Sequence, residues 1–158
     1  MAENRPSWDE YFLNMVDVVG TRSTCDRGKI GCVIVRDRRI LATGYAGSPS
    51  GTDQCDTHGH QMKTVTHADK SQSEHCVRTI HSELSGLLQC ARFGIATEGA
   101  TVYVTMTPCI NCAKALINAG IVKVIARKGY QTSSDTFDLF KQAGIEYTQI
   151  ENEVQQYT

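Results

Sequence analysis

Apolar residues recur at helical spacing near the start of the chain. Ser7 and Glu10, three positions apart, fit a capping box that would begin a helix. Residues 7–20 then carry an apolar stripe made of Tyr11, Phe12, Met15, Val18 and Val19. Two runs rich in β-branched residues follow at 30–35 and 39–43, separated by a polar turn. The pattern predicts an amphipathic helix followed by a β-hairpin.

Strand and helix patterns alternate in the second half of the chain. They predict strands at 102–104, 122–126 and 145–150, and helices at 80–93, 109–119 and 136–143. Such alternation implies right-handed βαβ crossovers and a mixed sheet with helices on both faces. We therefore expect one α/β domain over residues 1–150 and a polar C-terminal tail, 151–158, that frays.

The periodicity fails between residues 52 and 78. This stretch holds histidines and cysteines among small polar residues: Cys55, His58, His60, His67, His75 and Cys76. A loop of this length inside a compact domain is usually functional or clamped by a metal ion.

Composition narrows the class of protein. The hydrophobic and charged fractions, 41% and 21%, are ordinary for a soluble domain. The 16 basic and 17 acidic residues give no electrostatic reason to expect a nucleic-acid polymer as partner. No run approaches the roughly 20 apolar residues that span a bilayer, and no signal-peptide pattern opens the chain, so we expect a cytoplasmic protein with no membrane contact. The odd count of 7 cysteines favours metal binding over disulfides.

Two short motifs carry recognisable chemistry, His81-Ser82-Glu83 and Pro108-Cys109-Ile110-Asn111-Cys112. His81, Cys109 and Cys112 supply three zinc-type ligands and leave the fourth tetrahedral position open for water, as in catalytic zinc sites. Because both motifs fall at predicted helix starts, two helix N-termini should meet at the ion. Glu83 is then placed to move protons as general acid and base.

H-x-E combined with P-C-x-x-C is the signature of zinc nucleobase deaminases. We therefore predict zinc-assisted hydrolytic deamination. Three alternatives remain: a closed structural knuckle with a fourth ligand elsewhere, a polynucleotide or tRNA deaminase that shares both motifs, and a catalytically inactive zinc subunit.

From about residue 7 to 145 the chain resembles the deoxycytidylate (dCMP) deaminases, especially their bacterial competence-operon and phage branch. The likeness includes the segments 8–12, 22–25, 76–83, 99–105 and 108–114. It implies a three-layer α/β/α cytidine-deaminase-like fold with a mixed sheet of about five strands. It also implies a homo-hexamer, conversion of dCMP to dUMP, and dCTP and dTTP as allosteric activator and inhibitor.

The chain departs from the family pattern at several pocket positions. The family reads Gly-Tyr-Asn-Gly and His-Ala-Glu-x-Asn-Ala, and both asparagines contact the nucleoside. This chain has Ala46, Ser82, Ser85 and Gly86 there. We weigh dCMP as substrate against a larger base, a purine nucleotide such as dAMP or dGMP or a 5-substituted dCMP, in an enlarged pocket. Tyr130 falls where the family has a tyrosine near the nucleotide, and Arg22 and Lys114 are candidate phosphate neighbours.

A second metal site is also expected. In the related branch a cysteine stands where this chain has His60, and either side chain can ligate zinc. Cys25, Cys55, His60 and His75 would form a closed site that pins the long loop, with His67, His58 or Cys76 as possible replacements for one member. The alternative is a set of solvated loop histidines and a buried thiol.

Overall fold

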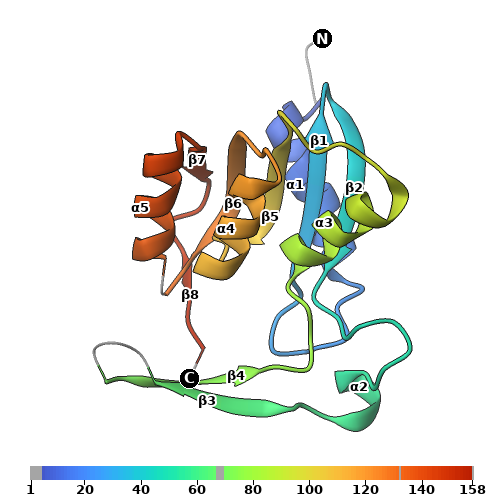
Figure 1. The fold of residues 1–158 in the computed structure, drawn as a ribbon, viewed down its shortest axis with the longest axis vertical. Helices are drawn as coiled ribbons and strands as arrows, with labels where there is room; N and C mark the ends of the chain where they lie inside the picture. Colours follow the sequence, from blue (N-terminus) through green and yellow to red (C-terminus); the bar gives the residue numbers. More distant parts are fainter. Residues whose placement is uncertain (1–4, 67–69, 132, 158) are drawn as a thin grey trace.

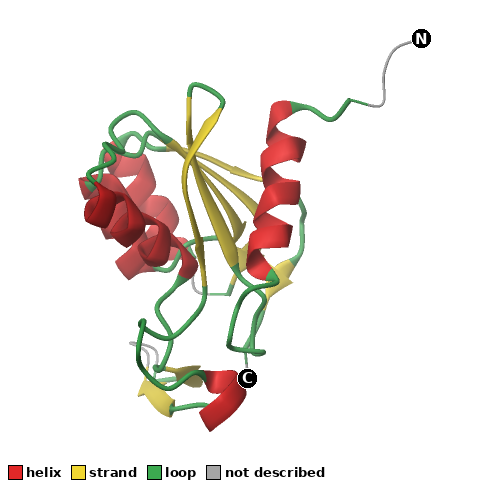
Figure 2. Ribbon diagram, turned by 90° about the vertical axis from the view of Figure 1, so that its right-hand side faces the viewer, coloured by secondary structure: helices red, strands yellow, loops and turns green. Residues whose placement is uncertain are grey.

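A mixed β-sheet with helices on both faces forms the body of the computed structural model, which describes residues 5–66, 70–131 and 133–157 (Figure 2). The strand order is β2-β1-β5-β6-β7, and β8 pairs with β6. β1 is antiparallel to β2 and β5, whereas β5, β6, β7 and β8 run parallel. The bounds are β1 Gly31–Arg36, β2 Arg39–Tyr45, β5 Thr101–Met106, β6 Lys123–Tyr130, β7 Glu146–Gln149 and β8 Val154–Gln155. The expectation of a mixed sheet of about five strands is confirmed.

The helices form the two outer layers. Helix α1 (Trp8–Gly20) covers one face of the sheet, and α3 (Ser82–Phe93), α4 (Ile110–Asn118) and α5 (Ser134–Ala143) cover the other (Figures 1 and 2). Ser7 begins α1 with the expected capping box, in which the Glu10 amide donates to Ser7 Oγ and the Ser7 amide donates to Glu10 Oε2. No helix in the described residues is both long enough and apolar enough to cross a membrane.

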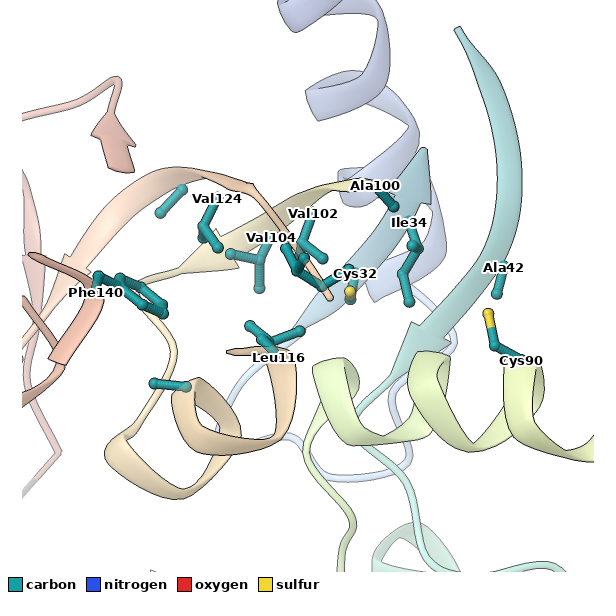
Figure 3. Packing of buried hydrophobic residues seen from close by; sticks show 13 residues of the cluster. Cys32, Ile34, Ala42, Cys90, Ala100, Val102, Val104, Leu116, Val124 and Phe140 are labelled. Carbon is teal, nitrogen blue, oxygen red and sulfur yellow. The ribbon is translucent and has the colours of Figure 1, made fainter. Parts of the chain in front are cut away.

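Strand β1 separates two hydrophobic clusters. Successive side chains of a strand point to opposite faces, so Cys32 and Ile34 face one cluster while Val33 and Val35 face the other. The larger cluster lies between the sheet and α3–α5 (Figure 3) and includes Ala42, Cys90, Val102, Val104, Leu116, Val124 and Phe140. The smaller cluster lies under α1. Burial on both faces explains why this strand reads as an unbroken apolar run.

The described residues of this stretch, 52–66 and 70–78, are more ordered than the sequence predicted. They form the short helix α2 (Cys55–His58) and an antiparallel hairpin of β3 (Met62–Thr66) and β4 (Gln72–Cys76), set apart from the main sheet (Figure 1). The prediction of a structureless loop was wrong because every residue of β3 is exposed, which leaves no alternation of apolar and polar positions.

The described part of the C-terminal tail is hydrogen-bonded to β6, where the sequence suggested a frayed end. The Gly129 amide donates to the Glu153 carbonyl at 2.8 Å, and β8 pairs with the end of β6. Backbone hydrogen bonds attach this polar segment, so hydrophobic periodicity gave no sign of it.

Candidate active site

Three zinc-type donor atoms meet where α3 and α4 begin. His81 Nδ1 lies 3.4 Å from Cys109 Sγ and 3.5 Å from Cys112 Sγ. A tetrahedral zinc ion with bonds of about 2.0 Å to nitrogen and 2.3 Å to sulfur separates such atoms by about 3.5 Å. His81 and Cys109 are the N-cap residues of α3 and α4, so two helix N-termini face the site. The donor set and its spacing fit zinc.

The electrostatics of this group favour thiolate ligands. Hydrogen bonds from Cys112 and His81 lower the pKa of Cys109 to about 4, and the hydrogen bond with Cys109 raises the pKa of His81 to about 9. The pKa of Cys112 is raised because its thiol hydrogen-bonds Cys109 and is desolvated by burial. Without metal, Cys109 and His81 therefore form a thiolate–imidazolium pair. Metal binding would release the protons of Cys112 and His81.

Glu83 lies in the first turn of α3, next to this group. It is 4% exposed, and Ser82, which is fully buried, donates to Glu83 Oε2 at 2.9 Å. Burial raises the pKa of Glu83, while the nearby His81 acts to lower it. A carboxyl group with a raised pKa is suited to both accepting and returning protons near neutral pH.

A close approach between β2 and α3 holds this turn in place. A Cβ on Gly44 would lie 2.1 Å from the Ser82 carbonyl oxygen and 2.5 Å from the Gly86 amide nitrogen. Only glycine at position 44 lets the strand lie so close to the helix. A Cβ on Gly86 would meet Ile34 Cδ1 at 3.2 Å, so Gly86 faces the core.

A pocket opens beside His81 and Glu83. Of the predicted substrate-binding residues, Ala46, Ser82 and Tyr130 line it. Ser85 and Gly86 do not, which corrects the expectation that they enlarge it. The pocket lies off the N-terminal end of α3, and these two residues lie further along the helix, which rises about 1.5 Å per residue.

Several pocket residues were not predicted from the sequence, Arg27 and Tyr157 among them, and two predicted neighbours of the phosphate lie elsewhere. Arg27 and Tyr157 line the pocket, whereas Arg22 and Lys114 do not. Arg27 lies two residues beyond the candidate ligand Cys25, which was an available signal. No pattern in the sequence indicated Tyr157.

A second cluster of metal-ligand types joins the long insertion to the body of the fold. One donor atom from each of Cys25, Cys55, His60 and Cys76 lies within 4.8 Å of the others. The sulfurs of Cys55 and Cys76 are 3.6 Å apart, as are Cys25 Sγ and His60 Nδ1. This spacing approaches the separation of about 3.5–3.8 Å expected around a tetrahedral zinc ion.

The fourth member of this cluster is Cys76, which the sequence offered as an alternative ligand, and not the predicted His75. Neighbouring residues of β4 point to opposite faces, so His75 and Cys76 cannot both face the cluster. His75 Nε2 instead hydrogen-bonds with Ser73 Oγ at 2.7 Å. His58 contacts Thr57 and Asp53 and is not part of the group, and His67 lies outside the described residues.

Asp26 and the backbone tune this second cluster. Asp26 Oδ1 lies 2.9 Å from His60 Nε2, which directs the other ring nitrogen toward Cys25. Burial acts to raise the pKa of Cys76, but backbone hydrogen bonds from Arg78 and Gln61 outweigh it, leaving a pKa of about 7. Cys76 is thus readily available as a thiolate.

Residues 6–128 match the family model described as the cytidine and deoxycytidylate deaminase zinc-binding region. The chain belongs to this family. ComE operon protein 2 of Bacillus subtilis (strain 168) is 42% identical over 147 residues, which cover 93% of this chain and 73% of that protein. The deoxycytidylate deaminase of Mycobacterium phage D29 is 38% identical over 127 residues, covering 79% of this chain and 98% of the phage protein.

Solved structures in the family share the fold. The dCMP deaminase of cyanophage S-TIM5, in complex with dCMP and dUMP, superposes with a TM-score of 0.73 at 26% identity. The match covers 93% of this chain and 99% of the cyanophage chain. The three-layer cytidine-deaminase-like fold expected from the sequence is confirmed.

Proposed function

We propose that the chain hydrolyses dCMP to dUMP and ammonia with the aid of zinc. The observation that carries the proposal is the zinc-like spacing of His81, Cys109 and Cys112 beside the buried carboxyl of Glu83. The names of the phage relatives and the nucleotides bound to the cyanophage protein support dCMP as substrate.

Each site residue has a proposed role. His81, Cys109 and Cys112 would hold the catalytic zinc ion, which when bound lowers the pKa of a water molecule for attack on the base. Glu83 would accept the proton from that water and return protons to the ring nitrogen and the departing ammonia. Ser82 fixes one Glu83 oxygen through its hydrogen bond and leaves the other oxygen for this transfer.

Arg27 is the proposed partner of the nucleotide's phosphate. Among the described residues that line the pocket, it is the only lysine or arginine. Its Nη2 donates to the Glu74 carbonyl at 3.0 Å, which fixes the side chain at the wall. A guanidinium can donate two parallel hydrogen bonds to phosphate oxygens. Ala46 and Tyr130 would contact the nucleoside part of the substrate.

A larger base is not favoured. Two of the four positions invoked for pocket enlargement, Ser85 and Gly86, do not line the pocket. The hydroxyl of a third, Ser82, is engaged with Glu83. Ala46 alone leaves space where the family has an asparagine.

The second cluster is proposed as a structural zinc site held by Cys25, Cys55, His60 and Cys76. These residues come from the segment before β1, from α2, from the segment after α2 and from the end of β4. A closed site would tie the hairpin to the body of the fold, where β4 contributes Glu74 and His75 to the pocket wall.

Assembly and regulation are proposed from the family resemblance: a homo-hexamer that dCTP activates and dTTP inhibits. Exposed apolar side chains on α3 support association, with Leu84 and Leu88 38% and 48% exposed on one helical face. Sedimentation velocity of the parent and of Leu88→Asp tests the assembly, and the variant should sediment as a smaller species. None of the 7 cysteines forms a disulfide, which supports a cytoplasmic location.

Ammonia release from a panel of nucleotides tests the proposed reaction. The zinc-loaded protein is given dCMP, 5-methyl-dCMP, dAMP and dGMP in separate assays, with Glu83→Gln as the blank. The highest kcat/KM should belong to dCMP. A preference for a purine nucleotide, or no ammonia from dCMP, would overturn the assignment.

A further inference from the structure

The C-terminal segment reaches the pocket through an ordered series of hydrogen bonds. β8 lies beside Gly129 and Tyr130 of β6, and Lys128 Nζ lies 2.9 Å from Glu153 Oε2. Beyond β8, the Gln131 side chain forms two hydrogen bonds with the backbone of Tyr157. The Tyr157 amide donates to Gln131 Oε1 at 2.9 Å, and Gln131 Nε2 donates to the Tyr157 carbonyl at 3.4 Å. Both the amide and the carbonyl of Tyr157 are therefore hydrogen-bonded to the Gln131 side chain.

The ring of Tyr157 forms part of the pocket wall. Its centroid is 6.2 Å from that of Tyr130, and its hydroxyl lies 4.0 Å from Met106 Sδ. A Cβ on Gly28 would be 2.7 Å from the Tyr157 hydroxyl oxygen, so the absence of a side chain at position 28 makes room for the phenol. Burial raises the pKa of Tyr157 to about 12, so the phenol stays neutral and does not repel an anion at neutral pH.

The same ring packs against the Arg27 guanidinium. Arg27 Cζ lies 5.8 Å from the ring centroid, within the range of a cation–π contact. The Glu74 carbonyl holds Arg27 from a second direction. Two contacts from distant parts of the chain thus fix the orientation of the one arginine at the described pocket wall.

We propose that Tyr157 is a positioning residue for substrate recognition, which holds Arg27 oriented toward the phosphate of a nucleoside monophosphate. The C-terminal segment thereby contributes to the choice of nucleotide over nucleoside. This inference rests on the proposed deamination of dCMP. It assigns a binding role to a part of the chain whose polar sequence suggests a free end.

The test compares dCMP with deoxycytidine, which lacks the phosphate. Tyr157→Leu removes the aromatic face and should raise KM for dCMP about three- to thirtyfold, the range expected for loss of a cation–π contact. Its kcat should stay within about twofold of the parent value, because Arg27 does not take part in proton transfer. The kcat/KM for deoxycytidine should be unchanged, and competition by dUMP should weaken more than competition by deoxyuridine.

Four further variants separate a positioning role of Tyr157 from structural damage. Tyr157→Phe keeps the ring and should restore most of the affinity for dCMP. Gln156→Ala changes the exposed neighbouring side chain and should match the parent. Arg27→Ala with Tyr157→Leu should bind dCMP no more weakly than Arg27→Ala alone, because the two residues act through one contact.

The possible results separate the two proposals. A parent protein that does not deaminate dCMP contradicts the proposed function. A parent that does, combined with an unchanged KM for dCMP in Tyr157→Leu or an equal loss for dCMP and deoxycytidine, overturns the role of Tyr157 and leaves the proposed function standing.

Discussion

The Ser82 hydroxyl donates to Glu83 Oε2 at 2.9 Å, and the two side chains are 0% and 4% exposed. A buried hydrogen bond to an ionised group contributes about 1.5–3 kcal/mol, which makes it an effective positioning contact. We expect Ser82→Ala to lower kcat for dCMP by about tenfold, which corresponds to the lower end of that free-energy range, and to change KM little.

Ser85→Ala is the matched control for this prediction. It makes the same change in the same helix, at a residue that does not line the pocket, and should leave both kinetic constants near the parent values. Steady-state kinetics and zinc analysis of both variants check the expectation. Equal losses of kcat in the two variants would contradict the positioning role of Ser82.

Alanine substitutions at Gly44 and Gly86 distinguish an effect on helix packing from an effect on pocket size. Gly44→Ala should destabilise the protein by about 3 kcal/mol, because its new methyl group would overlap the backbone of α3. Gly86→Ala should shift the free energy of unfolding by no more than about 1 kcal/mol, because improved helix propensity offsets crowding at Ile34.

The KM of Gly86→Ala for dCMP measures whether this position shapes the pocket. Gly86 faces the core, so KM should not change. Urea unfolding and steady-state kinetics supply both quantities. A marked rise in KM for this variant, without loss of stability, would show that Gly86 does contribute to substrate binding.

Elemental analysis tests the second metal site. The parent should hold two zinc ions per chain, and Cys76→Ser should hold one, with a lower melting temperature because structural zinc contributes to folding free energy. His75→Ala should retain two, since His75 does not join the cluster. One zinc ion in the parent protein, or loss of zinc from His75→Ala alone, would refute this set of four ligands.

The pair formed by Cys109 and His81 predicts a pH dependence for the zinc-free protein. The pKa of Cys109 is lowered to about 4, so its stabilising effect requires the thiolate and is lost as pH falls through that value. The pKa of His81 is raised to about 9, so its effect requires the imidazolium and is lost as pH rises through that value. At the ordinary pKa values, 9.0 for a thiol and 6.5 for an imidazole, both groups are neutral in the unfolded chain between pH 6.5 and 9. The stabilisation by the charged pair is therefore complete between pH 6.5 and 9 and declines as pH falls from 6.5 toward 4.

Unfolding of zinc-free parent and Cys109→Ser across this range measures the effect. The parent's advantage in free energy of unfolding should be largest between about pH 6.5 and 9 and should shrink as pH falls toward 4. An advantage that does not change with pH would contradict the charged pair.

Local sequence signals accounted for most of the central fold. The capping box at Ser7 and the apolar run of β1 each correspond to a single physical cause, a helix cap and a strand buried on both faces. The zinc motif was equally predictable from the sequence, because Cys109 and Cys112 lie three residues apart at the start of a helix. In these segments local pattern and tertiary environment agree.

The missed features depend on contacts between distant residues. The choice of Cys76 over His75 is decided by which face of β4 turns toward Cys55, and hydrophobic pattern cannot reveal that in an exposed hairpin. Tyr157 reaches the pocket through hydrogen bonds of the backbone and of Gln131. Such contacts leave no trace in residue periodicity.

The catalytic proposal depends most on Glu83, so the decisive measurement pairs activity with metal content in Glu83→Gln. The substitution keeps the shape of the side chain and removes its ability to accept a proton. We expect zinc content equal to the parent and dUMP formation reduced by about 10²–10⁴-fold, the usual contribution of general acid–base catalysis. Glu146→Gln, a change at an exposed ion pair with Lys123, should retain full activity. Near-parent turnover of dCMP by zinc-replete Glu83→Gln would contradict the proposed role of Glu83 and the mechanism built on it.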